Sequence, residues 1–157
     1  MAGFLGEYKA TLDAKGRFLL PSGLKKQMEE SSDKRFVISR GLEKHLNLYP
    51  WDEWNNVFGR VSNLEDFDPE VRQFRRYFMN GATIIELDSA GRMLIPQNLK
   101  AHAGLEKDIS LVATGKLIEI WDDGKYDKFF EEFPIEKFSE MGKKLMSKKD
   151  PGNPNLT

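Results

Sequence analysis

The sequence predicts an α+β, β-rich protein in which tandem β-β-α-β-β units close into a small β-barrel with flanking helices. The main observation is a doubled motif, LDAKGRFLLP at residues 12–21 and LDSAGRMLIP at residues 87–96. Short runs rich in β-branched and aromatic residues surround both copies, as expected for strands. The segments that follow each copy also match, which indicates duplication of one supersecondary unit.

Each repeat begins with two predicted strands joined by a tight turn. In the first repeat the strands are expected at residues 7–12 and 17–20. Between them, Asp13 accepts bonds from N–H groups ahead of it, and Gly16 takes a positive φ. The second repeat has the same turn residues, as Asp88 and Gly91. A proline ends the second strand in both repeats, because proline cannot donate to a strand ladder.

A helix and two further strands are expected to complete each repeat. In the first repeat, Ser22 is the expected cap of a helix over residues 24–30, followed by strands at residues 36–40 and 46–50. In the second repeat, the helix is expected at residues 99–104 and the strands at residues 109–113 and 117–121. A helix opens after the last strand of each repeat, at WDEWNNVF and at DDGKYDKFF.

Four short strands and one helix bury too little apolar surface to be stable alone. Two copies that complete each other would form a closed barrel and would leave no exposed strand edge. The expected organisation has four parts: repeat 1 at residues 5–54, linking helices at 55–81, repeat 2 at 82–126, and a C-terminal helix and flexible tail at 127–157.

The composition argues against several classes of protein. The chain has no cysteine, so neither disulfides nor thiolate metal sites are available. No secretory signal or bilayer-spanning apolar run is recognisable, so a soluble intracellular protein is expected. His45 and His102 lack zinc-ligand spacing, and no catalytic triad, phosphate-binding loop or dinucleotide fingerprint occurs. We therefore expect no enzyme, metal, cofactor or small-molecule substrate.

The doubled D-x-x-G-R turns, the tandem repeats and the intervening helix EVRQFRRYFMN resemble the MraZ family over residues 4–132. The resemblance implies two SpoVT-AbrB-type units with a swapped-hairpin, double-psi-like barrel. It also implies a DNA-binding transcriptional regulator that acts on the promoter of its own division and cell-wall gene cluster. Such a protein would be a ring-shaped homo-oligomer, cytoplasmic and associated with the nucleoid.

The motif itself suggests how DNA would be bound. A guanidinium is a planar, permanently charged fork that binds phosphate or the O6/N7 edge of guanine. Arg17 and Arg92 follow the turns directly, and Asp13 and Asp88 could hold them in one rotamer. The expected DNA-binding residues are Arg17, Lys15, Lys9, Lys25, Lys26 and Arg92, with Asp13, Gly16, Asp88 and Gly91 shaping the turns and positioning the arginines.

The first repeat has the more basic motif, so we expect it to make most of the DNA contact. A net charge of −1 makes tight binding by one subunit difficult. A ring could instead bind double-stranded DNA that has several short direct repeats, spaced near one helical turn.

Several alternatives remain open at this stage. The protein could be an oligomeric scaffold in which the D-x-x-G-R turns are structural only. The helix around residues 70–80 is amphipathic and could form a subunit interface, which the resemblance favours, or an extra phosphate contact. Trp51 and Trp54 could stack on bases, but packing is the expected role. The basic segment at residues 143–157 is expected to be a frayed helix and a solvated tail.

Overall fold

The computed structural model describes residues 3–30 and 33–147, and the expected tail at residues 148–157 lies outside them. The chain divides into two compact units, Met1–Gly124 and Lys125–Thr157.

The α+β class is confirmed. The strands are β1 (Phe4–Thr11), β2 (Arg17–Leu19), β3 (Phe36–Arg40), β4 (Leu46–Pro50), β5 (Thr83–Ile85), β6 (Arg92–Leu94), β7 (Asp108–Gly115) and β8 (Ile118–Asp122). The helices are α1 (Ser22–Glu29), α2 (Trp51–Ser62), α3 (Pro69–Met79), α4 (Gln97–Ala103), α5 (Asp123–Glu131) and α6 (Ile135–Met146).

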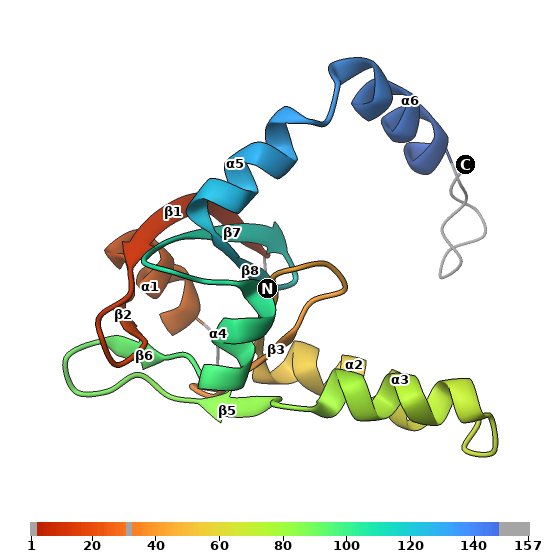
Figure 1. The fold of residues 1–157 in the computed structure, drawn as a ribbon, viewed down its shortest axis with the longest axis horizontal. Helices are drawn as coiled ribbons and strands as arrows, with labels where there is room; N and C mark the ends of the chain where they lie inside the picture. The colour runs from red at the N-terminus through yellow and green to blue at the C-terminus, as the bar shows by residue number, and fades with distance from the viewer. Residues whose placement is uncertain (1–2, 31–32, 148–157) are drawn as a thin grey trace. The chain divides into compact units, whose positions relative to one another are not determined.

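The strands of the first compact unit form a six-stranded antiparallel sheet and a separate two-stranded ribbon (Figure 1). The order in the sheet is β1-β7-β8-β4-β3-β5, and the ribbon pairs β2 with β6. Strand β1 of repeat 1 pairs with β7 of repeat 2, while β5 of repeat 2 pairs with β3 of repeat 1. Each repeat therefore contributes its first strand to the other repeat, so the two copies complete each other as expected.

The closure of the sheet differs from the closed barrel that we expected. Among the described residues, no strand pairing joins the two edge strands β1 and β5. The reason is that β2 and β6 leave the sheet and pair with each other. The expected hairpin between β1 and β2 is likewise reduced to one closing bond, from the Asp13 N–H to the Arg17 carbonyl at 2.8 Å.

The main core lies between the sheet, the ribbon and helices α1 and α4. Phe18 of β2 and Met93 of β6 are each 1% exposed, and Leu24 and Leu99 anchor the two helices in the same cluster. A smaller cluster lies where α2 and α3 meet the sheet, and it contains Val37, Tyr49, Trp54, Val61 and Phe78. Trp54 is thus a core residue, as expected. Among the described residues, no helix has the length and apolar character needed to cross a bilayer.

The cap of helix α1 also differs from the predicted Ser22. Ser22 is the first residue of α1, and Pro21 holds the cap position before it, where its side chain makes no capping hydrogen bond. Pro96 has the same place before α4. Pro21 and Pro96 have ψ values of 139° and 142°, the non-helical backbone of a cap residue, so each helix starts directly after its proline.

The edge strand β1 is protected by a side chain of α1. The Gln27 amide accepts from the Leu5 N–H at 2.9 Å and donates to the Leu5 carbonyl at 2.8 Å. It also donates to the Tyr8 hydroxyl at 2.9 Å. The amide thus satisfies backbone groups that would otherwise be free to pair with a strand of another molecule.

Replacing Gln27 by alanine is expected to lower the free energy of unfolding by about 1 kcal/mol, because it removes these bonds. Urea denaturation monitored by circular dichroism measures the change. Gln73→Ala is the matched control, since Gln73 is exposed on α3. A Gln27→Ala protein as stable as the control variant would show that the edge needs no such protection.

Candidate nucleic-acid interface

The two D-x-x-G turns have the same geometry in both repeats. The Gly16 N–H donates to the Asp13 carbonyl at 3.0 Å, and the Gly91 N–H donates to the Asp88 carbonyl at the same distance. Gly16 has a φ of +83° and Gly91 a φ of +80°. Side chains with a Cβ rarely adopt this conformation, so glycine is required at the end of each turn.

An aspartate fixes the arginine that follows each turn. In repeat 1, Asp13 Oδ1 accepts from the backbone N–H groups of Lys15 and Arg17, both at 2.9 Å. Its Oδ2 accepts from Arg17 Nε at 2.9 Å. Asp88 makes the same three bonds, to Ala90 N–H, Arg92 N–H and Arg92 Nε. One carboxylate therefore closes the turn and also holds the guanidinium in one orientation.

These ion pairs leave part of each guanidinium available. The bond to aspartate uses only Nε, and within the described residues neither Nη of Arg17 or Arg92 has a hydrogen-bond partner. Their side chains are 28% and 37% exposed, respectively. Each arginine is thus oriented by its Nε and keeps both terminal nitrogens free to donate, which is the arrangement needed for bidentate recognition.

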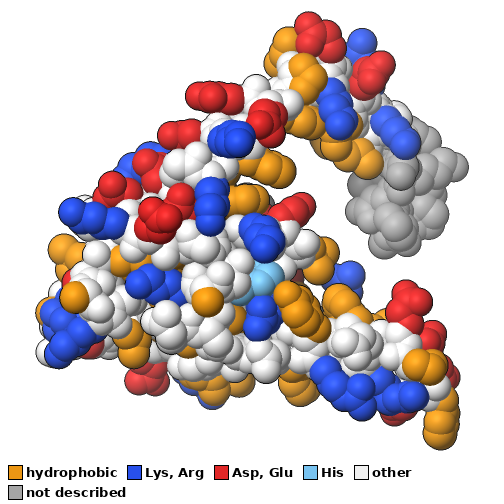
Figure 2. Space-filling model, viewed as in Figure 1, with side chains coloured by type: hydrophobic (Ala, Val, Ile, Leu, Met, Phe, Trp, Pro, Cys, Tyr) orange, Lys and Arg blue, Asp and Glu red, His pale blue; other side chains and the backbone are white. Residues whose placement is uncertain are grey.

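The ribbon joins the two motifs into one surface. Strands β2 and β6 are antiparallel, with Arg17 opposite Leu94 and Leu19 opposite Arg92. Residues that lie opposite each other point to the same face of a ribbon. Because Phe18 and Met93 between them point into the core, both arginines point outward. Figure 2 shows basic and hydrophobic side chains gathered at its left-hand edge, over the loops that precede β2 and β6.

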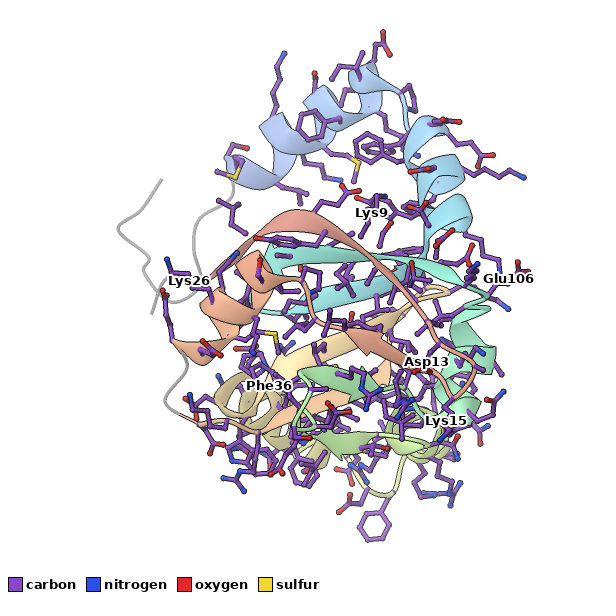
Figure 3. All side chains as sticks on the ribbon, turned by 90° about the vertical axis from the view of Figure 1, so that its left-hand side faces the viewer. Lys9, Asp13, Lys15, Lys26, Phe36 and Glu106 are labelled. Carbon is purple, nitrogen blue, oxygen red and sulfur yellow. The ribbon has the colours of Figure 1, made fainter. Side chains whose placement is uncertain are left out.

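The structure does not bring all the predicted lysines to this surface. Lys15 is exposed in the first turn beside Asp13, whereas Lys26 lies on the opposite side of the view in Figure 3. Lys25 of repeat 1 approaches the turn of repeat 2, with its Nζ 3.6 Å from the place of a Cβ on Gly91. The helix of one repeat therefore adds positive charge beside the turn of the other.

Lys9 forms ion pairs away from the two turns. It lies on β1, away from Lys15 (Figure 3), and its ammonium group pairs with Asp123 and Glu7. The Asp123 carboxylate is the main reason that the pKa of Lys9 is raised, and Lys9 in turn lowers the pKa of Asp123. Ser110 also bonds to both groups. Lys9 thus holds the edge strand to the start of α5.

The pKa values of Asp13 and Asp88 lie below the usual 3.8. The main cause is the backbone N–H of the following arginine, which donates to each carboxylate. The guanidinium groups lower them further. Because the pKa is lower in the folded state, these carboxylates stabilise the fold fully at a pH above their pKa in the unfolded chain. This stabilisation is lost only as the pH falls through their pKa in the folded protein. Neither carboxylate therefore titrates near neutral pH.

Replacing Asp13 by asparagine is expected to keep the turn, because the remaining oxygen still accepts both backbone bonds. The new amide N–H₂ faces Arg17 Nε, so the arginine is no longer fixed. Ordering one side chain costs about 0.5–1.5 kcal/mol, so specific DNA affinity should fall by roughly twofold to twelvefold. Fluorescence anisotropy measures the affinity, with Asp52→Asn on α2 as the charge-matched control. Unchanged or tighter binding would show that the ion pair does not help to present the arginine.

A second surface feature lies where α2 and α3 leave the sheet. An apolar groove of about 460 Å³ is lined by Leu42, Val57, Val61, Leu64, Phe74 and Phe78, among others. We call it the α2–α3 groove. It continues into a pocket of about 370 Å³ that shares Leu42, Phe74 and Phe78.

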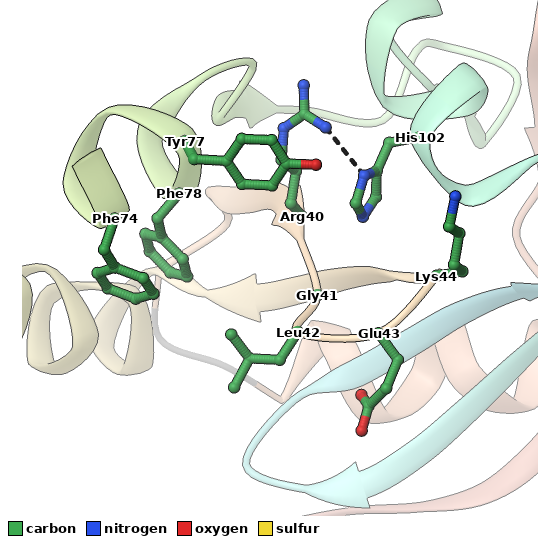
Figure 4. Close-up of a pocket in the computed structure, with 9 residues that line it drawn as sticks. All are labelled: Arg40, Gly41, Leu42, Glu43, Lys44, Phe74, Tyr77, Phe78 and His102. Carbon is green, nitrogen blue, oxygen red and sulfur yellow. Dashed lines mark hydrogen bonds between the residues drawn. The ribbon is translucent and has the colours of Figure 1, made fainter. Parts of the chain in front are cut away.

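Figure 4 shows that adjoining pocket. The Arg40 guanidinium lies 4.6 Å from the centre of the Tyr77 ring and bonds to His102 Nδ1 at 2.9 Å. Its other nitrogens donate to Asn80. Arg40 is therefore committed to holding α3 and α4 against the sheet. Among the described residues, no group of three His, Asp or Glu side chains could hold a metal ion.

Sequence reasoning located both turns and both arginines but missed their union in one ribbon. It also missed Leu19 and Leu94, which are 63% and 52% exposed on the ribbon's outer face. The sequence does contain a sign of these leucines, since both motifs have leucine two positions after arginine.

Two interlocked repeats that share an arginine-bearing ribbon define a duplicated, strand-swapped protein. A family model described as "MraZ protein, putative antitoxin-like" matches residues 4–77 and again residues 78–148. A transcriptional regulator MraZ of Cytophaga hutchinsonii is 41% identical over 94% of this chain and 97% of its own length. Proteins of the same name from Acetivibrio thermocellus and Christiangramia forsetii are 39% and 37% identical, over 80% and 96% of this chain and 85% and 97% of their own lengths. The chain belongs to the MraZ family.

Proposed function

We propose that this protein is a sequence-specific DNA-binding regulator that places the β2–β6 ribbon in the major groove. The observation that supports this most is the pair of oriented arginines on one outward face, each with terminal nitrogens that bond to none of the described residues. The major groove is wide enough for a two-stranded ribbon, and a guanidinium binds O6 and N7 of guanine there. Lys15 and Lys25 lie beside the two turns and would contact the flanking phosphates.

The biological target is inferred from the family. The relatives are named transcriptional regulators. The resemblance of the sequence to the MraZ family implies control of a division and cell-wall gene cluster. We infer that this protein binds the promoter of its own cluster, in the cytoplasm and at the nucleoid.

Assembly would compensate for the small contact that one ribbon can make. The chain has a net charge of −1, and one ribbon presents only two arginines. A ring repeats the ribbon, so several subunits can bind successive direct repeats on one duplex. Such multivalency raises the overall affinity by about 10²–10⁴-fold. Repeats spaced by about 10 bp would present the same groove to each ribbon.

A ring needs two different surfaces on each subunit, because its contacts run head to tail. The α2–α3 groove is one candidate. The other is an apolar stripe along α6, formed by Ile135, Phe138, Met141 and Leu145, all exposed. Charges near the groove support this pairing: the α2–α3 tip carries Glu65, Asp68 and Glu70 besides Asp66, which pairs with Arg75, and the last turn of α6 carries Lys143 and Lys144. We infer that α6 of one subunit packs into the groove of the next.

A scaffold with purely structural turns is the second candidate, and the two Asp–Arg ion pairs favour it. Such pairs need no DNA to explain them. The two functions predict different DNA binding, because a scaffold has no reason to prefer one DNA sequence.

Binding of the full-length protein to the segment upstream of its own gene tests the proposal, with a shuffled duplex of equal length as the control. Gel shifts at about 150 mM salt should show a clear preference for the natural segment, which weakens steeply as salt rises. Inserting half a helical turn between repeats should reduce affinity far more than inserting a whole turn. Equal binding to both duplexes would favour the scaffold.

A further inference from the structure

The outer face of the ribbon has two leucines as well as two arginines. Leu94 lies opposite Arg17, and Leu19 lies opposite Arg92, so the four side chains form a square with like residues on the diagonal. The leucines are 63% and 52% exposed, for Leu19 and Leu94 respectively. Neither belongs to the two core clusters.

A single exposed leucine needs no explanation, since such residues are common on protein surfaces. The matching positions of Leu19 and Leu94 do need an explanation. The two repeats differ at the neighbouring core positions, Phe18 against Met93 and Leu20 against Ile95, and in the turn, Lys15 against Ala90. Packing therefore allows substitution along this strand. The exposed leucine between the core positions is nevertheless identical in both repeats.

The square matches the chemistry of two bases. In the major groove, guanine presents two acceptors, which suit arginine, and thymine presents a 5-methyl group, which suits an apolar side chain. Residues two apart on a strand are separated by about 6.8 Å, close to two base steps, and opposite residues by about 5 Å. One ribbon can thus place an arginine and a leucine on bases of the same short stretch.

We propose that Leu19 and Leu94 contact the 5-methyl groups of thymines next to the guanines bound by Arg17 and Arg92. They would be specificity-determining residues. This inference rests on the proposed function, because it requires the ribbon to enter the major groove. It predicts that each bound repeat contains guanine and thymine within about three base pairs.

The test removes either partner of the contact, the methyl group of the thymine or the side chain of the leucine. The full-length protein first selects duplexes from a randomised pool, and each thymine of the selected site is then replaced by deoxyuridine. Wild type should bind about fourfold more weakly for one or two of these replacements, the effect of one buried methyl group. Leu19→Ala should lose a similar factor on the thymine duplex and should no longer distinguish thymine from uracil at one of those positions. Leu94→Ala should do the same at another.

Three controls make the outcome decisive. Leu5→Ala changes another exposed leucine, on β1, and should keep the full response to uracil. Affinity for nonspecific duplex and the oligomeric state should be unchanged in both ribbon variants. If both variants respond to uracil as wild type does, the inference is wrong although DNA binding stands. If they dissociate the oligomer, the leucines form a protein contact instead. If no duplex is selected, the proposed function fails together with the inference.

Discussion

Replacing Arg17 by alanine is expected to reduce specific DNA affinity by at least about 100-fold while the oligomer remains intact. One bidentate arginine–guanine contact is worth about 1–3 kcal/mol, and the loss recurs in every subunit that engages the duplex. The fold should tolerate the change, because the buried neighbour Phe18 and the turn bonds of Asp13 remain. Fluorescence anisotropy and size-exclusion chromatography measure the two properties.

Arg92→Ala should cause a smaller but clear loss. The two arginines are fixed by the same three bonds to aspartate, so the difference depends on the turns, where the first has Lys15 and the second has Ala90. Arg76→Ala on α3 is the control for the loss of one positive charge. Equal losses for the two ribbon variants would contradict the ranking, and wild-type affinity in Arg17→Ala would show that this arginine is structural.

Replacing Phe74 or Phe138 by glutamate is expected to break the oligomer into smaller species. Phe74 lines the α2–α3 groove, and Phe138 lies in the middle of the α6 stripe. A carboxylate buried without a partner costs several kcal/mol, so each change should weaken association by about 100-fold or more. Gln73→Glu and Ser139→Glu are the controls, since both add the same charge at exposed positions on the same helices.

Mixing the two variants distinguishes this head-to-tail contact from a symmetric one. The Phe74→Glu protein keeps a functional α6, and the Phe138→Glu protein keeps a functional groove. Together they can form one intact interface, so the mixture should give dimers and no larger species. Analytical ultracentrifugation measures the distribution. Persistence of monomers in the mixture would contradict the pairing of groove and α6.

Much of the fold was predictable because the signals are local. Strands β3 and β4 match the predicted bounds, since Phe, Val and Ile dominate β3 and leucines alternate with Asn47 at the start of β4. The turns were predictable for the same reason, because Asp and Gly have specific backbone roles there. Helix α1 begins earlier than expected because Pro21, and not Ser22, takes the cap position.

The strand pairing was less predictable, because it depends on contacts between distant segments. Nothing in the local sequence of β2 shows whether it pairs with β1, a few residues before it, or with β6 in the other repeat. For the same reason, sequence reasoning treated Lys9, Lys15, Lys25 and Lys26 as one group of positive charges around the first motif. In the structure, Lys9 holds Asp123, and Lys25 approaches the turn of repeat 2.

Methylation interference tests most directly whether the shared ribbon binds in the major groove through its arginines. Duplexes partly methylated at guanine N7 and adenine N3 are incubated with the full-length protein, and the bound and free fractions are compared. We predict that N7 methylation of one or two guanines per repeat excludes DNA from the bound fraction, and that Arg17→Ala removes this effect at one of these guanines. Interference confined to adenine N3, in the minor groove, or an N7 pattern unchanged in Arg17→Ala and Arg92→Ala, would contradict binding by the ribbon.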